Sequence, residues 1–405
     1  MVDAATATTA PPTRTTAAAK TTTTRRATTT KPAKASKTVT LLVVAPSSGP
    51  HLESGTAAVR AVKLAITHAT EDRLLPSGWG VEVETIDEAA NSGPAPAVGR
   101  TLKKNADIVA VIGALDPVTA GPLGAATAAQ STTLFLLSPD ATRAEPAAAG
   151  TTPAVTLRLL TDDTTTGTYA GNYALSGPVL AAAGSKVATA SDSPASARAF
   201  AAAVTARLAS SGAAVASLGL AATDHEVLTP AFVTKVFDTA PRLIAFGGAV
   251  ETGVPLSAAA RRAQPVATFL VGGQVGVSGC ADALSALGEG DLCAVGATPL
   301  SNAERARAFR EDYAAAGHGA PTVSVTAAYD AATMVLRVLP AVIRSLGDDP
   351  DPDALRAPLM TALRTTRLDG ATGTSRFDAA GNRVTPSISV LRKQAGRWVV
   401  AVATT

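Results

Sequence analysis

The chain has 405 residues, a formal net charge of +3, 46% apolar residues and 3% aromatic residues. A chain of this length and apolar content can fill the cores of two lobes. Residues 1–37 hold seven Lys and Arg residues and one acid, so the rest of the chain is mildly acidic. An acidic body with few aromatic rings lacks the basic, stacking surface that nucleic acids require, which excludes that class of partner.

The first segment, 1–37, is rich in Thr, Ala, Pro and Lys and has almost no large apolar side chain. Burial cannot offset its ordering entropy, so we predict a disordered linker. A solvated spacer is the favoured interpretation, and contact of its basic side chains with an anionic surface is the alternative. The segment lacks the apolar stretch of about 7–15 residues that a secretory signal needs. No run of roughly 18 apolar residues predicts a membrane span.

Beyond this segment, short apolar runs alternate with longer stretches of helical spacing. The expected strands are 39–45, 81–86, 107–112, 133–137, 155–160, 186–190, 213–219, 242–246, 267–271, 293–298, 387–392 and 397–403. This rhythm is typical of βαβ units, and about ten parallel strands indicate an α/β fold with two doubly wound lobes. Ligands of such folds bind beyond the carboxyl ends of the strands, so we expect a site in a cleft between the lobes.

The first turn, APSSGPHLESG (45–55), joins the first expected strand to the first expected helix. Ser54 is the expected N-cap of that helix. The expected buried stripe of the helix consists of Val59, Val62, Ile66 and Ala69. A phosphate-binding loop is excluded, because the glycine spacing is wrong and the essential Lys is absent.

No arrangement of residues predicts catalysis. The four histidines are scattered along the chain, and the GxSxG turn of serine hydrolases is absent. No group of Cys and His has the spacing of a metal site. We therefore expect a protein that is not an enzyme and that uses no cofactor or metal.

The two cysteines, Cys280 and Cys293, lie in a Gly-rich segment. Their spacing suits a disulfide, which would add roughly 3 kcal/mol of stability in the loop-entropy model. Two small buried thiols are the alternative. A disulfide would place the protein outside the reducing cytosol.

Five stretches in order resemble the type I periplasmic binding proteins, in particular the receptors for leucine, isoleucine and valine. They are 39–66, 107–142, 155–175, 327–336 and 370–384. The resemblance implies two Rossmann-like lobes joined by three crossovers near Arg158, Pro299 and Phe377. Lobe one would comprise 38–157 plus 300–375, and lobe two 158–299 plus 376–405. It also implies hinge closure around a small molecule, driven by better ligand contacts in the closed state.

In that family, hydroxyls and backbone N–H groups hold the ligand carboxylate in turns that match GALDPVT (113–119) and SPDAT (138–142). The implied ligand contacts in lobe one are Ser54, Asp116, Pro117, Thr119, Asp140, Ala141 and Thr142. Ser54 stands where the receptors often have an aromatic ring, and Pro117 offers neither a hydroxyl nor an N–H group. Asp116 and Asp140 either compensate the charge of a ligand ammonium or, as the favoured alternative, only cap helices.

In lobe two the resemblance implies contacts at Ser196, Ala249 and either Gly273 or Gln274. The family often has tyrosines and an acid at these positions, and this chain has neither. An ammonium buried without a counter-charge is costly, which disfavours a standard branched-chain amino acid as the ligand.

The expected function is that of an extracytoplasmic solute-binding protein, at the cell surface or secreted. It would capture a small polar molecule, an amino acid or an analogue, and deliver it to an ABC permease in the membrane. One alternative is a sensor domain that signals to a kinase or regulator. The other is a degenerate lobe pair that serves as a protein-interaction module.

Overall fold

The structure is a computed structural model, and only part of the chain is described. The described residues are 37–89, 93–139, 156–176, 179–180, 185–192, 195–219, 234, 238, 240–273, 287–297, 304–347 and 350–404. The expected linker, apart from Lys37, lies outside them. So do Asp140, Ala141, Thr142, Gln274 and Cys280.

The first sheet has five strands in the order β2-β1-β3-β4-β5, and all of its pairings are parallel. The strands are β1 (Lys37–Ala45), β2 (Trp79–Asp87), β3 (Ile108–Ile112), β4 (Thr133–Leu136) and β5 (Thr156–Arg158). Every residue of β3 and β4 is buried. Continuous apolar runs of this kind suit parallel strands that are covered on both faces.

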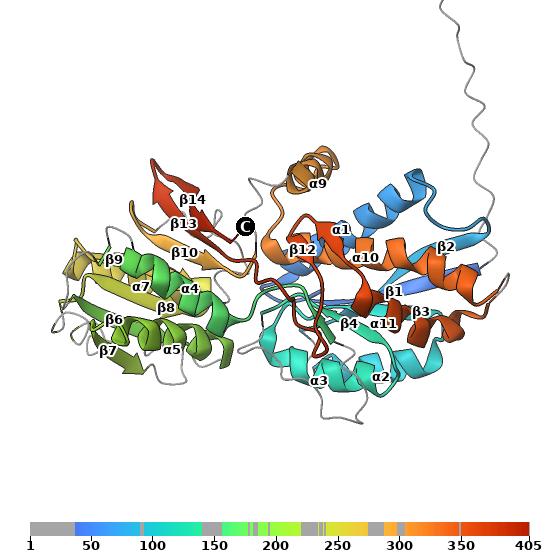
Figure 1. Ribbon diagram of the computed structural model, residues 1–405, viewed down its shortest axis with the longest axis horizontal. Coiled ribbons are helices and arrows are strands. Elements are labelled where there is room, and N and C mark those ends of the chain that lie inside the picture. The colour runs from blue at the N-terminus through green and yellow to red at the C-terminus, as the bar shows by residue number, and fades with distance from the viewer. Residues whose placement is uncertain are drawn as a thin grey trace, which may run out of the picture. The chain divides into compact units, whose positions relative to one another are not determined.

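Helices cover both faces of this sheet, as Figure 1 shows. The helices are α1 (Leu52–Glu71), α2 (Ala95–Lys104), α3 (Pro117–Ala128), α10 (Val323–Ser345) and α11 (Arg356–Thr365), with a 3₁₀ turn at Pro352–Leu355. Leu41 and Val43 of β1 belong to the core cluster that α1 and α10 complete. Leu42 and Val44 belong to the cluster with α2 and α3. Successive residues of β1 therefore pack on opposite helical layers.

The second sheet has seven strands in the order β14-β13-β10-β9-β8-β6-β7. Its parallel strands are β6 (Lys186–Ser191), β7 (Ala214–Gly219), β8 (Leu243–Gly247), β9 (Thr268–Gly272) and β10 (Leu292–Val295). The antiparallel strands β13 (Ser389–Gln394) and β14 (Arg397–Ala403) extend it at one edge.

The helices α4 (Asp163–Ser176), α5 (Ala195–Ala209) and α7 (Val250–Ala263) cover the second sheet. Val187 and Leu243 pack with α4 and α5, whereas Ala188 and Ile244 belong to the cluster with α7. The helix α9 (Glu304–Ala315) packs elsewhere, on α10 and α1. Its Phe309 ring lies 4.5 Å from that of Tyr329, and its Tyr313 hydroxyl donates to the Ala57 carbonyl.

All twelve expected strands have an observed counterpart, and the expected pair of doubly wound sheets is confirmed. β1 begins at Lys37, two residues early, because Lys37 pairs with Trp79 and its Nζ donates to the Pro350 carbonyl. The hairpin β11 (Leu368–Gly370) and β12 (Gly373–Ser375) was not predicted. Its three-residue strands are too short to show an apolar alternation.

The expected N-cap of α1 is wrong. The helix begins at Leu52, three residues earlier than a Ser54 cap requires, and its N-cap residue His51 makes no side-chain capping bond. The turn before it uses Gly49, at φ +72°, whose carbonyl accepts from the Leu52 N–H. Ser54 is exposed within the first helical turn. The expected stripe is half correct, since Val62 and Ala69 are buried but Val59 and Ile66 are only partly buried.

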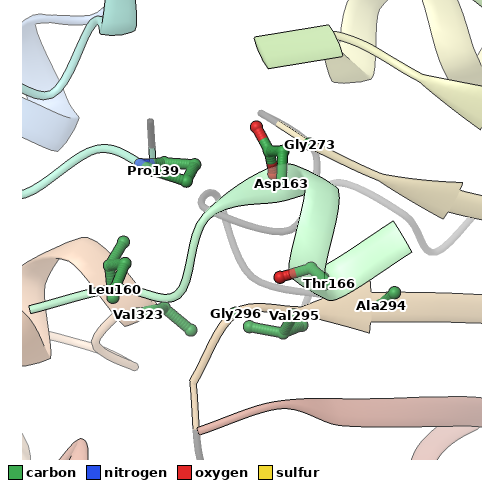
Figure 2. Close-up of a pocket in the computed structure, with 9 residues that line it drawn as sticks. All are labelled: Pro139, Leu160, Asp163, Thr166, Gly273, Ala294, Val295, Gly296 and Val323. Atoms are coloured by element: carbon green, nitrogen blue, oxygen red, sulfur yellow. The ribbon is translucent and has the colours of Figure 1, made fainter. Parts of the chain in front are cut away.

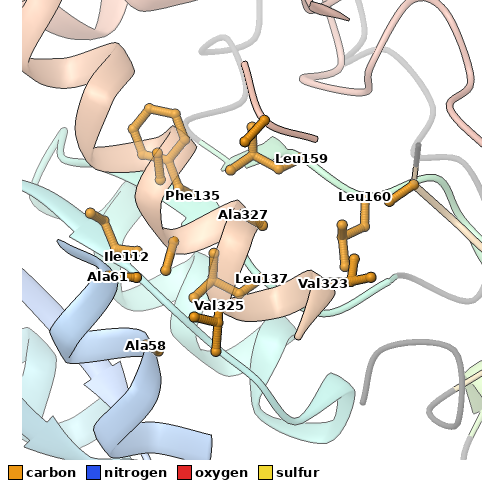
Figure 3. Close-up of a cluster of buried hydrophobic side chains, with 14 of the residues drawn as sticks. Ala58, Ala61, Ile112, Phe135, Leu137, Leu159, Leu160, Val323, Val325 and Ala327 are labelled. Atoms are coloured by element: carbon orange, nitrogen blue, oxygen red, sulfur yellow. The ribbon is translucent and has the colours of Figure 1, made fainter. Parts of the chain in front are cut away.

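The helix α10 is the longest described helix and crosses the core. Seventeen of its 23 residues are buried. By length and hydropathy it passes a test for a membrane span, but 78% of the apolar window is buried inside the fold. Figure 3 shows its Val325 and Ala327 in the buried cluster to which Ala58 and Ala61 of α1 also belong. It is therefore a core helix of this fold.

The chain passes three times between the two sheets, and hydrogen bonds tie the connecting segments together. Thr161, on the segment after β5, donates its N–H to the Gly296 carbonyl at 2.9 Å. The Thr161 hydroxyl donates to the Ser387 carbonyl and accepts from the Ser387 N–H. Thr161 therefore contacts both other connecting segments. The exact residue boundaries of the two lobes stay a prediction.

A buried arginine and a buried aspartate lie beside these connections, and each is hydrogen-bonded to the β11–β12 hairpin or its turn. Arg383 is 3% exposed and donates to the carbonyls of Leu159, Thr372 and Thr374, each at 2.9 Å. Asp330 of α10, 1% exposed, accepts from the Ala371 N–H and from the N–H and hydroxyl of Thr372. Burial lowers the pKa of Arg383 to about 10, and the Asp330 charge opposes that change. Both side chains therefore hold the β11–β12 hairpin.

Candidate functional site

A small pocket lies where elements of both sheets meet. Its lining residues are Pro139, Leu160, Asp163, Thr166, Gly273, Ala294, Val295, Gly296 and Val323 (Figure 2). The volume that a water-sized sphere can occupy in it is about 10 Å³, room for about one water molecule. The pocket in this structure is therefore much smaller than ordinary ligand pockets, which start at roughly 300 Å³.

The polar side chains of this pocket come from the beginning of α4. Asp163 is 2% exposed, and of the described residues that line the pocket it alone has an ionisable side chain. Thr166 lies one turn further along, and its hydroxyl donates to the Asp162 carbonyl. A Cβ at Gly296 would lie 2.6 Å from the Thr161 carbonyl oxygen, so the second connection must pass α4 closely. The remaining lining is apolar or glycine.

At the carboxyl ends of β6 and β8, Asp192 organises a second group of residues. It is 5% exposed and accepts from the Ala249 N–H at 2.7 Å, while its own N–H donates to the Gly247 carbonyl. A Cβ at Gly248 would lie 2.3 Å from the Asp192 carboxylate, so only glycine fits there. Asp192 thereby fixes the turn that begins α7.

Ser196 and Gly273 lie beside this turn. The Ser196 hydroxyl is buried and has no hydrogen-bond partner among the described residues. Gly273 has φ +71°, and a Cβ there would lie 3.4 Å from the Gly248 nitrogen. The structure therefore brings Ala249 and Gly273 together, with Ser196 in the first turn of the neighbouring α5. Whether these residues bind a ligand stays a prediction.

Glu88 follows β2, and its side chain reaches into the turn between β3 and α3. Its carboxylate accepts from the N–H groups of Leu115 and Asp116, both at 2.9 Å, and from the Thr119 hydroxyl at 2.6 Å. Glu88 is 5% exposed. Burial raises its pKa above the ordinary 4.5, and the hydrogen bonds from Thr119, Leu115 and Asp116 oppose that rise. The Thr119 hydroxyl, a predicted ligand contact, is thus held by a side chain of the protein.

Asp116 is the N-cap of α3. Helix capping was the favoured of the two roles that the sequence left open for this residue. Its Oδ1 accepts from the Val118 N–H at 2.9 Å. Pro117 occupies the first helical position, where a missing N–H group costs nothing. The neighbouring Asp87 accepts from the Ser47 N–H and the Ser48 hydroxyl. Asp87, the last residue of β2, and Glu88, the residue after it, therefore hold the turns that follow β1 and β3.

The sequence reasoning missed Glu88, Asp163 and Asp192. Each lies at or just after the end of a predicted strand, or at the beginning of the helix that follows it. Because ligands of doubly wound folds bind at that edge, acidic residues after each strand were a usable signal. Of the predicted site residues that the structure describes, Gly273, the alternative to Gln274, is the one that lines the pocket.

Cys293 is fully buried on β10. Cys280 lies outside the described residues, so the disulfide stays a prediction. Among the described residues, no group of three or more His, Cys, Asp or Glu side chains has the arrangement of a metal site.

Two doubly wound sheets, three connections and a pocket where they meet define a two-lobed binding protein. The profile of the periplasmic binding proteins matches residues 38–397. The chain therefore belongs to the periplasmic binding protein family and has the type I fold, as the resemblance implied. This family consists of solute-binding proteins. No curated protein matches the chain.

Solved structures of the same fold cover 90% of this chain. The LivJ substrate-binding protein of Streptococcus pneumoniae, in complex with isoleucine, has a TM-score of 0.69 at 19% identity over 98% of its length. The leucine-binding protein LivK of Thermotoga maritima has a TM-score of 0.68 at 18% identity over 98% of its length. A solute-binding protein of R. palustris in complex with benzoate has a TM-score of 0.70 at 17% identity over 96% of its length. Likeness at such low identity establishes the fold alone.

Proposed function

We propose that this protein captures a small polar solute between its two lobes and delivers it to an ABC permease, without making or breaking a bond. The observation that carries this proposal is the pocket, which takes Pro139 and Val323 from elements of the first sheet and Gly273 and Val295 from the second. A solute that contacts both walls stabilises the conformation in which they meet. Solved structures of the same fold supply further support, because one was solved in complex with isoleucine and another in complex with benzoate.

A ligand panel tests this proposal. A bound ligand raises the free energy of unfolding by RT ln(1 + [L]/Kd), which amounts to about 2.7 kcal/mol at 100 times Kd. We expect one chemical group in a panel of amino acids, amino-acid amides, amines, urea-like compounds and small acids to raise the melting temperature. Replacing Thr166 by valine, in the pocket, should reduce that shift, whereas Thr67→Val on the exposed face of α1 should not. A panel without any response would favour the protein-interaction module.

The proposed location is outside the cytosol, as the family name suggests, and a Cys280–Cys293 disulfide accompanies it. Structural disulfides persist in oxidising compartments and are rare in the cytosol. Thiol titration of the denatured protein from its natural source is therefore expected to find no free thiol before reduction and two after it. Two thiols before reduction would contradict both the disulfide and this argument for the location.

A further inference from the structure

A larger cavity lies further along α4, and its described lining shares no residue with that of the pocket between the sheets. It is an open groove whose lining residues are Tyr169, Asn172, Tyr173, Leu175, Ser176, Arg207 and Val402. The volume that a water-sized sphere can occupy in it is about 520 Å³, within the range of ordinary ligand sites, roughly 300–1,000 Å³. The groove therefore has the size of a site for a small molecule.

Close packing of α4 on α5 fixes the walls of this groove. A Cβ at Gly167 would lie 2.5 Å from the Phe200 carbonyl oxygen, and a Cβ at Gly171 would lie 3.1 Å from Cβ and Cγ of Arg207. Glycine at these two positions, one helical turn apart, lets the helices approach each other closely. The Arg207 side chain therefore passes α4 at Gly171, and its Nε donates to Oδ1 of Asn172.

Arg207 brings a positive charge to the groove, and no described acid neutralises it. Its Nη1 donates to the Ser210 hydroxyl at 3.1 Å. Its Nη2 has neither a hydrogen bond nor a carboxylate partner among the described residues. The described lining of the groove contains no Asp or Glu. A guanidinium with an available N–H edge suits an oxyanion, and a carboxylate above all, because the two planar groups match in geometry and charge.

Two tyrosines form the aromatic part of the groove. Tyr169 and Tyr173 lie one turn apart on α4, and both pack on the core cluster of the second sheet, as does Val402 of β14. Neither tyrosine hydroxyl has a hydrogen-bond partner among the described residues. Burial raises the pKa of Tyr169 above its ordinary value, so its hydroxyl keeps its proton at neutral pH and can donate. Aromatic side chains favour a flat ring, which packs against them by stacking or edge to face.

We propose that this groove is a second binding site, for a small molecule that carries a carboxylate on a flat, apolar ring. The carboxylate pairs with the Arg207 guanidinium, and the ring contacts Tyr169, Tyr173 and Val402. The lining residues belong to α4, α5 and β14, which all form part of the second sheet or its cover, so binding there needs no contact with the first sheet. The proposal does not rest on the proposed function.

The tyrosine signals of an NMR spectrum test this site directly, because the chain has only four tyrosines. Tyr169 and Tyr173 line the groove, whereas Tyr313 and Tyr329 lie on α9 and α10. No tyrosine is among the described residues that line the pocket between the sheets. In protein with ring-labelled tyrosine, sodium naphthoate should shift the signals of Tyr169 and Tyr173, with a Kd of about 1 mM or lower. The signals of the other two tyrosines should stay in place.

Naphthamide is the matched control ligand, because it keeps the ring and lacks the charge. It should bind at least about tenfold more weakly than naphthoate. Arg207→Met should weaken the binding of naphthoate by a similar factor and leave that of naphthamide unchanged. The matched control Arg262→Met removes the same charge from an exposed position on α7 and should bind naphthoate as the wild type does.

Three results would each overturn the proposal. They are a naphthoate titration to about 10 mM, roughly ten times the expected Kd, that does not shift Tyr169 and Tyr173 selectively, equal binding of naphthoate and naphthamide, and equal binding by Arg207→Met and the wild type. If Arg207→Met is not recovered folded, the comparison of the two ligands on the wild type decides. A solute panel without any response contradicts the proposed function and leaves the tyrosine result as it stands.

Discussion

Replacing Arg383 by methionine is expected to lower the free energy of unfolding by about 3–5 kcal/mol. Arg383 is buried on the third connection, and it donates to the Leu159 carbonyl on the first connection and to the Thr372 carbonyl of the β11–β12 hairpin. Methionine fills much of the same volume but supplies neither the charge nor the donors. The carbonyl groups that accept from Arg383 would lose their donor, and Asp330 would lose the positive charge that opposes the rise in its pKa on burial.

Urea denaturation of Arg383→Met and of Arg367→Met measures this difference. Arg367 also lies beside an aspartate, Asp369, but its side chain is 66% exposed. An exposed pair contributes only about 0–1 kcal/mol, so Arg367→Met should stay close to the wild type. Equal losses in the two variants would mean that the buried Arg383 does not hold the connections together.

Gly381→Ala is expected to cost about 2–4 kcal/mol. Gly381 has φ +77°, where alanine is strained by roughly 1–2 kcal/mol. A Cβ there would also lie 1.9 Å from the Thr156 carbonyl oxygen, a backbone atom of β5 that cannot give way easily. The Gly381 carbonyl accepts from the Arg158 N–H, so the clash falls on the contact between the first and third connections.

Gly396→Ala is the matched control for Gly381→Ala. Gly396 has φ +73° in the β13–β14 turn, and a Cβ there would meet no atom within 4 Å. Its expected cost is the backbone strain alone, roughly 1–2 kcal/mol. Comparing the melting temperatures of both variants separates the cost of backbone strain from the cost of the steric clash. Equal melting temperatures would contradict the close packing at Gly381.

The sheets were predictable because their signal is local. Runs such as Ile108–Ile112 are continuous and apolar, and they occur between helical stretches at regular intervals. The hairpin at 368–375 gave no such signal, since its strands are short and its turn is held by Asp330, 41 residues before Ala371, and by Arg383, 11 residues after Thr372. The beginning of α1 was wrong because Ser54 suits a cap by residue type, while the actual start is set by the turn at Gly49.

The candidate site was less predictable because its contacts join distant residues. Resemblance selected Thr119 from the turn alone, and nothing in that turn indicates that its hydroxyl is held by Glu88, 31 residues earlier. Likewise, the sequence showed no acid near Ala249. The acid that contacts its N–H group, Asp192, lies 57 positions earlier in the chain. Only the order of strands in each sheet brings these pairs together.

Native mass spectrometry of the protein purified from its natural source, with no solute added, tests the proposed function most directly. The expected result is one small molecule per chain, released on denaturation. The mass of the chain alone, combined with a ligand panel that leaves the melting temperature unchanged, would contradict a solute-binding function.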